Sequence, residues 1–491
     1  MSPNRLRLLC AIGGGIGFAL CSPPTDLYPM VWIGLAALYV ATADAPSAKR
    51  AALYGWLWSA VATVVGMRFI PGVVDRFTPL GMAGGVAALV LLAAGQSVPW
   101  GLALGVGHWV SEKTGLDRRI AFAAAVTGAS VVTLVIAWSP GALVSPWPVL
   151  VQLADLIGER GLTFLFALMA ALVASYKKGW RAPALGAALF VVVLGYGAFR
   201  LSAVRAWHAE LPTLKVGVVQ ASVGARLRWE PGAQSEILGR LRRLTLDSER
   251  AGVDLTIWPE AAYPYVLGAK PGRMPRGRRS IVAGPLHGPV LFGALMRAPD
   301  GAYNAATIVG PDGVTQAPQA KMELLWFGET VPFSQYWPWL RHQFFRAGGL
   351  VPGTEVQLLE SGPARIGVLN CYEDTLAGVG RRIAEKQPNL LVNVTNDAWF
   401  GPTAEPELHL RLAVLRSVEL RRDLVRAVNL GIPAWIDASG TIRKRGNGEA
   451  TSVMVVEPAL VDGPPTLYAR VGDWPLIVLL LLFVGDALRR K

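Results

Sequence analysis

The residue best suited to do chemistry in this chain is a cysteine at the end of an apolar run. Residues 365–375 read RIGVLNCYEDT, so Cys371 directly follows a predicted strand over 365–370. A thiol at a strand end, where the chain turns, is well placed to be a nucleophile. The ordinary alternative is a small buried hydrophobic residue, which is common for a free cysteine. The position before Tyr-Glu favours the nucleophile.

The cysteine count leaves this thiol without a partner. The chain has three cysteines, and Cys10 and Cys21 both lie in the first apolar segment. If that segment is helical, about 16 Å separates them, which is too far for a disulfide. If Cys371 lies outside the cytoplasm, as the charge pattern discussed below predicts, its surroundings favour disulfides. An unpaired thiol is a liability there unless the protein uses it.

A cysteine nucleophile needs a base and a group that stabilises the oxyanion. The chain has five histidines and none lies in a convincing motif; His409 falls on an expected helix and is interpreted as a surface or packing residue. Glu260 ends the predicted strand VDLTIW, and its apolar neighbours can raise its pKa into the range of a base. Lys321 could lower the pKa of the thiol and hold an oxyanion. Taken singly, Glu260 could be a solvated loop carboxylate and Lys321 a surface charge.

Taken together, Glu260, Lys321 and Cys371 occur in the order of the Glu-Lys-Cys triad, and the chain resembles the nitrilase superfamily. Within that superfamily it is similar to the apolipoprotein N-acyltransferase family over nearly its whole length. The motifs that carry the resemblance are Arg228-Trp229, WPE at 258–260, YNAA at 303–306, FGE-x-VP at 327–332, CYE at 371–373 and NVTNDAWFG at 393–401. The chain departs from the family pattern at Ala261, Gln319 and Leu325-Trp326, which leaves its substrate preference open.

The resemblance implies an α-β-β-α sandwich and a two-step acyl transfer. A fatty acyl chain would pass from a phospholipid to Cys371 as a thioester, and then to the N-terminal amine of a diacylglyceryl-cysteine apolipoprotein. Glu260 would be the base, while Lys321 and the backbone N–H of Tyr372 would hold the oxyanion. Glu329 would orient the lysine or complete the acid–base set, unless it is only a loop carboxylate. Glu373 would support the site, with a simple ion pair near it as the alternative. The resemblance implies no metal or other cofactor, and we expect a monomer.

Composition places much of the chain in a membrane. Of its 491 residues, 52% are hydrophobic and only 16% are charged, against a usual charged fraction of about 25%. We expect seven spans before residue 200 and an eighth near the C-terminus, the long stretch 80–110 counting as one kinked span. The apolar segments are 8–21, 27–42, 51–67, 80–110, 120–138, 161–176, 182–199 and 474–485. A signal peptide over 1–21 is the alternative for the first segment.

The distribution of Lys and Arg predicts the orientation of these spans. Basic residues collect in alternate connections, and cytoplasmic loops carry such an excess. The N-terminus is therefore expected inside the cell, residues 200–472 outside and the C-terminal tail inside. The resemblance to a bacterial enzyme family then implies an inner membrane with the catalytic domain on the periplasmic side. Much of the formal charge of +13 then comes from the Lys and Arg of the cytoplasmic connections. These basic residues are scattered between apolar helices, which argues against a nucleic-acid partner.

The outward segment reads as an α/β domain. Short apolar runs alternate with helical ones, which is typical of a sandwich with helical layers. We predict a seven-helix transmembrane domain over 1–200, a nitrilase-like domain over 213–460 and a C-terminal transmembrane helix with its tail over 472–491. The expected strands are 215–220, 253–258, 280–286, 290–297, 303–310, 365–370 and 389–396, and the expected helices are 233–251 and 405–424.

Tryptophans supply the candidates for lipid contact. The segment 333–345, FSQYWPWLRHQFF, is dense in aromatic residues, which favour the membrane interface. We interpret it as an arm that dips into lipid near the site; a packed loop of the domain core is the alternative. The candidate contact residues are Trp258, Trp326, Trp337, Trp339 and Trp399.

Two functions from other classes stay open at this point. A membrane-tethered amidase acting on a small soluble substrate would share the triad, but it would not need eight spans. A transporter or scaffold with an inactive domain would carry ionisable residues within its spans, and the apolar segments here carry almost none.

Overall fold

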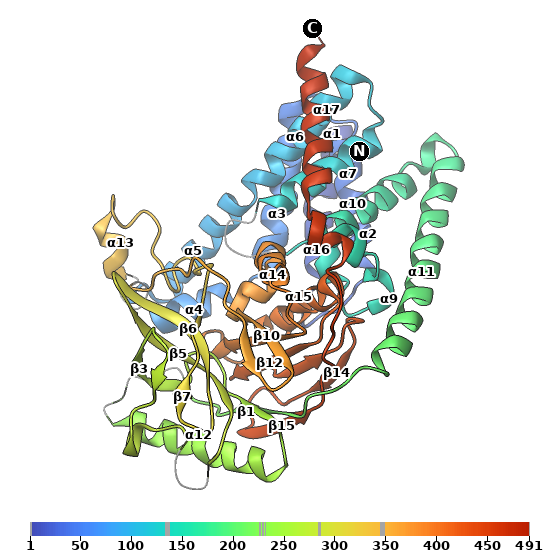
Figure 1. Cartoon of the computed structure of the whole chain (residues 1–491). Helices are drawn as coiled ribbons and strands as arrows, with labels where there is room; N and C mark the ends of the chain where they lie inside the picture. The colour runs from blue at the N-terminus through green and yellow to red at the C-terminus, as the bar shows by residue number, and fades with distance from the viewer. Residues whose placement is uncertain are drawn as a thin grey trace. The chain divides into compact units, whose positions relative to one another are not determined.

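The computed structural model describes residues 2–132, 138–224, 227, 230, 232–282, 286–343 and 349–490. Contacts divide the chain into two compact units, drawn in Figure 1. The helical unit comprises Met1–Arg76, Leu80–Ala203 and Arg470–Lys491, and the sandwich unit comprises Phe77–Pro79 and Val204–Ala469. The motif Arg228-Trp229, the middle of the predicted strand 280–286 and the end of the aromatic segment 333–345 lie outside the described residues.

Two β-sheets form the centre of the sandwich unit. The first has the order β15-β1-β2-β5-β6-β7-β4, with β3 on β5 and β8 on β6, and the second has the order β14-β13-β12-β11-β10-β9. The strands of the first sheet are β1 (Val216–Gln220), β2 (Leu255–Ile257), β3 (Tyr263–Gly268), β4 (Gly272–Arg273), β5 (Val290–Ala298), β6 (Gly301–Val309), β7 (Val314–Thr315), β8 (Gln319–Ala320) and β15 (Ser452–Val456). Those of the second are β9 (Leu359–Ser361), β10 (Ala364–Asn370), β11 (Leu390–Asn396), β12 (Leu424–Asn429), β13 (Ala434–Ile436) and β14 (Ile442–Arg445).

The inner faces of the two sheets pack against each other. Val218 and Ile257 of the first sheet share one buried cluster with Ile366, Val392 and Val425 of the second. In Figure 1, α12 (Ala233–Arg250) lies beside the strands of the first sheet, and its buried Ile237 and Leu241 pack on the outer face of that sheet. Helices α14 (Ala377–Ala384) and α15 (Glu405–Leu420) cover the second sheet in the same way. The predicted α-β-β-α sandwich is confirmed.

The sequence predicted most of these elements within a few residues, and two differences have local causes. The described part of 280–286 contains no strand, and Ser280 instead bonds its hydroxyl to the carbonyl of Val282. The helix expected over 405–424 ends at Leu420, because Arg421 adopts a left-handed φ of 49° that closes the helix. The strand β12 can therefore begin at Leu424.

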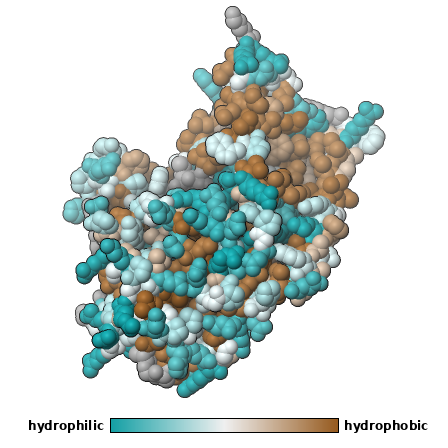
Figure 2. All heavy atoms as spheres, viewed as in Figure 1, coloured by the Kyte–Doolittle hydropathy of each residue, from teal (hydrophilic) through white to brown (hydrophobic). Residues whose placement is uncertain are grey.

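Apolar helices make up the other unit. They are α1 (Pro3–Ala19), α2 (Met30–Thr42), α3 (Ala48–Gly66), α4 (Ile70–Phe77), α5 (Gly81–Gln96), α6 (Val98–Thr114), α7 (Arg118–Val131), α8 (Pro140–Leu143), α9 (Pro148–Val151), α10 (Ala154–Ala174), α11 (Arg181–His208) and α17 (Trp474–Arg489). Most residues of the short helix α16 (Leu467–Val471) belong to the sandwich unit. Figure 2 shows hydrophobic residues covering much of the visible surface of this unit. Among them Leu91, Val191 and Leu481 are 72%, 65% and 65% exposed, as expected for side chains that face lipid.

Some of these helices are long enough to cross a bilayer. Within the described ranges, Gly81–Thr114, Ala154–Ala174 and Arg181–His208 have the length and hydropathy of a span, and α3 with α4 forms a pair bent by 60° that makes a fourth. The stretch 80–110 thus behaves as one interrupted span, with its break before Pro99. The predicted spans 8–21, 27–42 and 474–485 are shorter helices in the structure, and residues 133–137 of the predicted span 120–138 lie outside the described residues. These four spans stay predictions.

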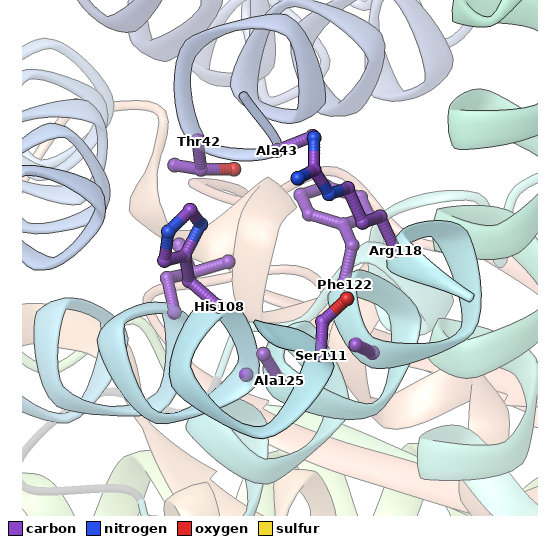
Figure 3. Close-up of a pocket in the computed structure, with 10 residues that line it drawn as sticks. Thr42, Ala43, His108, Ser111, Arg118, Phe122 and Ala125 are labelled. Carbon is purple, nitrogen blue, oxygen red and sulfur yellow. The ribbon is translucent and has the colours of Figure 1, made fainter. Parts of the chain in front are cut away.

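The helical unit contains a buried ion pair and a small polar-lined cavity. Arg200 donates from Nε and Nη2 to one oxygen of the buried Asp155, at 3.1 and 2.9 Å. Figure 3 shows a small cavity between α2, α6 and α7, in which His108 and Arg118 lie on opposite sides. Its volume of about 20 Å³ has room for one water-sized molecule, so it is too small to bind a lipid headgroup.

Candidate active site

Cys371 occupies a sharp turn at the end of β10. It opens the short 3-10 helix η4 (Cys371–Thr375), and its φ of 53° lies in the left-handed region. A residue other than glycine adopts this conformation only where its surroundings hold it, and such strain is often found at functional sites. Asn393 of β11 supplies one restraint, because its Nδ2 donates to the carbonyl of Cys371 at 2.8 Å.

Charges of both signs surround the thiol. Burial and the charge of Glu260 raise the pKa of Cys371 to about 12, although Lys321 and His409 act in the opposite direction. With that pKa, roughly one thiol in 10⁵ is ionised at neutral pH. The cysteine therefore needs a base that accepts its proton as the sulfur attacks.

Glu260 is placed as such a base. It follows β2 of the first sheet and is 6% exposed. Its Oε1 accepts hydrogen bonds from Nδ2 of Asn304 at 2.7 Å and from Nζ of Lys321 at 3.3 Å. Burial raises the pKa of Glu260 above its usual value; Lys321 opposes this and Glu329 adds to it. A carboxylate with a raised pKa is a better proton acceptor at neutral pH.

Lys321 lies between two carboxylates. It directly follows β8 and is 2% exposed, and its Nζ lies 2.8 Å from Oε2 of Glu329 and 3.3 Å from Oε1 of Glu260. Burial alone would lower the pKa of Lys321, but the charges of Glu329 and Glu260 outweigh it and hold the pKa well above its ordinary value. The lysine is therefore a fixed cation and not a base.

Asn304 is a member of the site for which no role was predicted from the sequence. It lies on β6, within the YNAA motif, and its Nδ2 donates to Glu260 at 2.7 Å and to Oε1 of Glu329 at 2.9 Å. Lys321 and Asn304 thus both bridge the same two carboxylates. The backbone N–H of Leu325 also donates to Oε2 of Glu329, at 2.9 Å, which ties this carboxylate to its own loop.

Glu373 joins the nucleophile turn to the lysine segment. Its Oε1 accepts from the backbone N–H groups of Met322 and Glu323 at 2.6 and 2.9 Å, and its Oε2 accepts from that of Asn370 at 2.8 Å. The carboxylate thus bonds backbone amides and not a basic side chain. Burial raises the pKa of Glu373 to about 7. The neighbouring Tyr372 places its ring 5.4 Å from Nζ of Lys321.

The tryptophans proposed as lipid contacts have different environments. Trp258 is completely buried in the core beneath α12, and its indole N–H donates to Oγ1 of Thr245 at 2.8 Å, so its surroundings exclude lipid contact. Trp326, Trp337 and Trp339 are 41%, 61% and 61% exposed, and Trp399 is half-buried. The described part of the aromatic segment is therefore a surface feature.

His409 was expected at a surface or in general packing, and the structure places it in a buried charge cluster. Its Nε2 lies 3.0 Å from Oδ1 of Asp374, and its Nδ1 lies 3.1 Å from Oδ1 of Asp397. Arg426 of β12 pairs with the other oxygen of Asp374. A hint in the sequence was the presence of an aspartate in each of two motif regions, three residues after Cys371 and within NDAWFG.

The same cluster contains the one group of side chains, among those described, that is arranged closely enough to hold a metal ion. Potential ligand atoms of Asp397, Glu405 and His409 lie within 4.8 Å of one another. Both ring nitrogens of His409 already face carboxylates, so the imidazole has no lone pair left for a cation. The arrangement favours an internal charge cluster over a metal site.

Comparison with known proteins finds a family model that matches each of the two units. Residues 14–172 match the model of the apolipoprotein N-acyltransferase N-terminal domain, and residues 215–460 match that of the carbon-nitrogen hydrolases. The apolipoprotein N-acyltransferase of Bradyrhizobium diazoefficiens is 32% identical, covering 99% of this chain and 95% of the relative. The chain belongs to the apolipoprotein N-acyltransferase family.

Other members of the family align over similar lengths. The apolipoprotein N-acyltransferase of Bdellovibrio bacteriovorus is 31% identical, with 94% of this chain and 89% of the relative covered. Among solved structures, a CN-hydrolase superfamily protein of Xanthomonas campestris matches 55% of this chain and 96% of its own, at 19% identity and a TM-score of 0.37. The family match thus covers both units, whereas the solved structure covers about half of the chain.

Proposed function

We propose that this chain moves a fatty acyl group from a phospholipid, through a thioester on Cys371, to the N-terminal amine of a diacylglyceryl-cysteine apolipoprotein. Membership of the apolipoprotein N-acyltransferase family supports the overall reaction. The observation that carries the mechanism is the fixed cation of Lys321 beside Glu260, in a site that also holds the strained turn of Cys371. This arrangement supplies a nucleophile, a base and an electrophilic group.

In the first half-reaction the sulfur of Cys371 attacks the carbonyl carbon of a phospholipid ester while Glu260 takes the thiol proton. The carbonyl oxygen becomes an oxyanion, which the ammonium of Lys321 and the backbone N–H of Tyr372 stabilise. When the C–O bond breaks, Glu260 returns its proton to the departing oxygen. The products are a lysophospholipid and a thioester.

The second half-reaction repeats these steps with an amine. The free α-amine of the acceptor attacks the thioester carbonyl, and Glu260 takes the proton that the nitrogen loses. The C–S bond breaks, and the proton returns to the sulfur of Cys371. The acceptor gains an amide-linked third acyl chain and the enzyme is regenerated, which is a ping-pong scheme.

Both substrates are membrane lipids, which accounts for a catalytic segment over 213–460 between apolar segments over 1–200 and 472–491. Membership of the family supports a place in the bacterial inner membrane. The basic residues collect in the connections assigned to the cytoplasm, which supports a catalytic domain on the periplasmic side. We expect the chain to act as a monomer. The exposed Trp337 and Trp339 fit an arm that contacts the bilayer surface.

Mass spectrometry of a lipoprotein N-terminus tests the proposed function. Bacteria depleted of this protein should accumulate the diacylated form, and the wild-type chain should restore the triacylated form. Cys371→Ala should fail to restore it, while Cys10→Ala, which removes a thiol from the helical unit, should succeed. Restoration by Cys371→Ala would contradict the proposal.

A further inference from the structure

His409 is held on both sides by carboxylates within the sandwich unit. Its two ring nitrogens lie 3.0 Å from Asp374 and 3.1 Å from Asp397, and its side chain is 3% exposed. An ionised carboxylate can only accept hydrogen bonds, and a neutral imidazole donates from only one nitrogen. Both contacts are favourable together only when both nitrogens carry a proton. The geometry therefore defines a buried imidazolium.

The two carboxylates belong to different turns. Asp374 lies in η4, three residues after Cys371, whereas Asp397 opens the 3-10 helix η5 (Asp397–Trp399) after β11. His409 projects from α15, a helix that packs against η4 and covers the second sheet. One side chain therefore ties the turn that carries the nucleophile to the next turn at the same end of the sheet.

The remaining charged groups around His409 set its protonation state. Arg426 of β12 pairs with Asp374 on the oxygen that His409 does not use, and Glu405 lies near Asp397 in the first turn of α15. Burial, and then the charge of Asp397, raise the pKa of Glu405 well above its usual value. The groups gathered around His409 are thus three carboxyl groups and one guanidinium.

Electrostatics agree with the geometry. Burial would lower the pKa of His409, but the opposing charge of Asp397 and its hydrogen bond raise it to about 10. The charge of His409 also acts on the nucleophile, because it lowers the pKa of Cys371 against the larger effect of burial. Lys321, which directly follows β8 of the first sheet, acts in the same direction.

We propose that His409 is a permanently charged positioning residue for the nucleophile. Its imidazolium holds the Cys371 turn through Asp374 and stabilises the negative charge that develops on the sulfur, without touching the substrate or exchanging a proton during turnover. This inference rests on the proposed function to the extent that Cys371 is the nucleophile.

The reactivity of the thiol toward a small water-soluble reagent tests this role directly. The full-length chain would carry Cys10→Ala and Cys21→Ala, so that Cys371 is its only thiol. Alkylation by iodoacetamide would be followed from pH 6 to 10 for this background, for His409→Gln and for the control His287→Gln. His287 is a matched control because its side chain is 81% exposed.

The imidazolium predicts a specific result. His409→Gln should slow alkylation by about tenfold at any pH below the thiol pKa, and it should move the pH profile up by about one unit, since one unit corresponds to a tenfold change in ionisation. His287→Gln should leave the profile in place. If the His409→Gln profile coincided with the background while only the melting temperature fell, the residue would be structural and the proposal wrong.

A second measurement covers the case in which His409→Gln does not fold. In the unsubstituted chain labelled with ¹⁵N-histidine, the His409 signal should show two protonated ring nitrogens at pH 8.5. The signal would be assigned by single substitutions of the other four histidines. A neutral tautomer at that pH would overturn the proposal. Neither experiment uses a lipid, so failure of the proposed acyl transfer would appear separately, as absence of an acyl-enzyme.

Discussion

Nζ of Lys321 lies 2.8 Å from Oε2 of Glu329, which is closer than its 3.3 Å contact with Glu260. Glu329 also accepts hydrogen bonds from Asn304 and from the backbone of Leu325, so both its oxygens are held. Glu260 accepts two bonds, both on Oε1, and one of them is long. This asymmetry supports the proposed roles, in which Glu260 transfers the proton and Glu329 anchors the lysine.

Glu329→Gln should therefore slow the reaction and also change its pH dependence. Loss of a charge-assisted hydrogen bond to Lys321 costs about 1.5–3 kcal/mol, or roughly 10- to 150-fold in kcat/KM if the cost falls on the transition state. Glu260 must be ionised to act, and Glu329 helps to raise its pKa. The acidic limb of the kcat/KM profile should therefore move to lower pH. Glu355→Gln, on an exposed loop, is the control, and an unmoved limb would contradict the assignment.

Glu373→Gln should destabilise the fold, by an amount that depends on pH. Both oxygens of the carboxyl group can accept a hydrogen bond, whereas the amide of glutamine turns an NH₂ group, which cannot accept, toward one of the backbone N–H groups. That N–H loses its acceptor at a cost of about 1–3 kcal/mol. The pKa of Glu373 is raised from 4.5 to about 7, so its protonated form stabilises the native state, and that contribution is lost as the pH rises from 4.5 to 7.

The variant cannot ionise at this position, so its deficit in melting temperature should shrink between pH 5 and pH 7.5. Thermal unfolding at both values, beside the exposed control Glu385→Gln, measures the difference. A deficit that stayed constant, or grew with pH, would mean that Glu373 is already ionised at pH 5.

Replacing Trp337 and Trp339 with Ala should separate lipid engagement from chemistry. Both side chains are 61% exposed, so the fold should survive their loss. Acylation of Cys371 from phospholipid vesicles should slow at limiting lipid, because aromatic side chains stabilise contact with the membrane interface. Acylation by a water-soluble thioester should keep its rate. If the rate fell equally with phospholipid and with the water-soluble thioester, the segment would be a structural part of the site and not a lipid contact.

Reporter fusions test the orientation of the chain. A reporter that is active only outside the cytoplasm should be active when fused after residue 210 and inactive when fused after Lys491. The prediction follows from the alternation of basic connections and from an odd number of crossings before the catalytic segment. Activity at Lys491 would exclude the predicted eight spans.

The fold, and the three residues of the candidate triad, could be read from the sequence because their signals are local. Strands such as β1, β5 and β11 are compact apolar runs. Lys321 and Cys371 directly follow a strand, and Glu260 lies three residues after the end of β2. In a sandwich of this kind the strand ends come together, so motifs far apart in the chain can form one site. The lengths of the transmembrane helices were harder to predict, because several apolar segments form helices shorter than a full span.

The remaining features depend on contacts that no local pattern reveals. His409 meets Asp374 and Asp397 from 35 and 12 residues away, and only the folding of α15 onto η4 makes it a charged core residue. Trp258 stands beside Pro259 and Glu260, and an apolar residue at that position could equally have faced a substrate or the core. Asn304 lay within a recognised motif, but its bridging role needs both carboxylates in place.

The central claim is that Cys371 carries the acyl chain between two lipid substrates, and intact-protein mass spectrometry tests it most directly. Incubated with phospholipid alone, the purified chain should gain the mass of one fatty acyl group on Cys371, which hydroxylamine removes. Adding a diacylated lipopeptide with a free N-terminal amine should discharge that group into a triacylated product, and Cys371→Ala should show neither step. Steady release of free fatty acid from phospholipid, with no mass gain on the protein, would contradict the account.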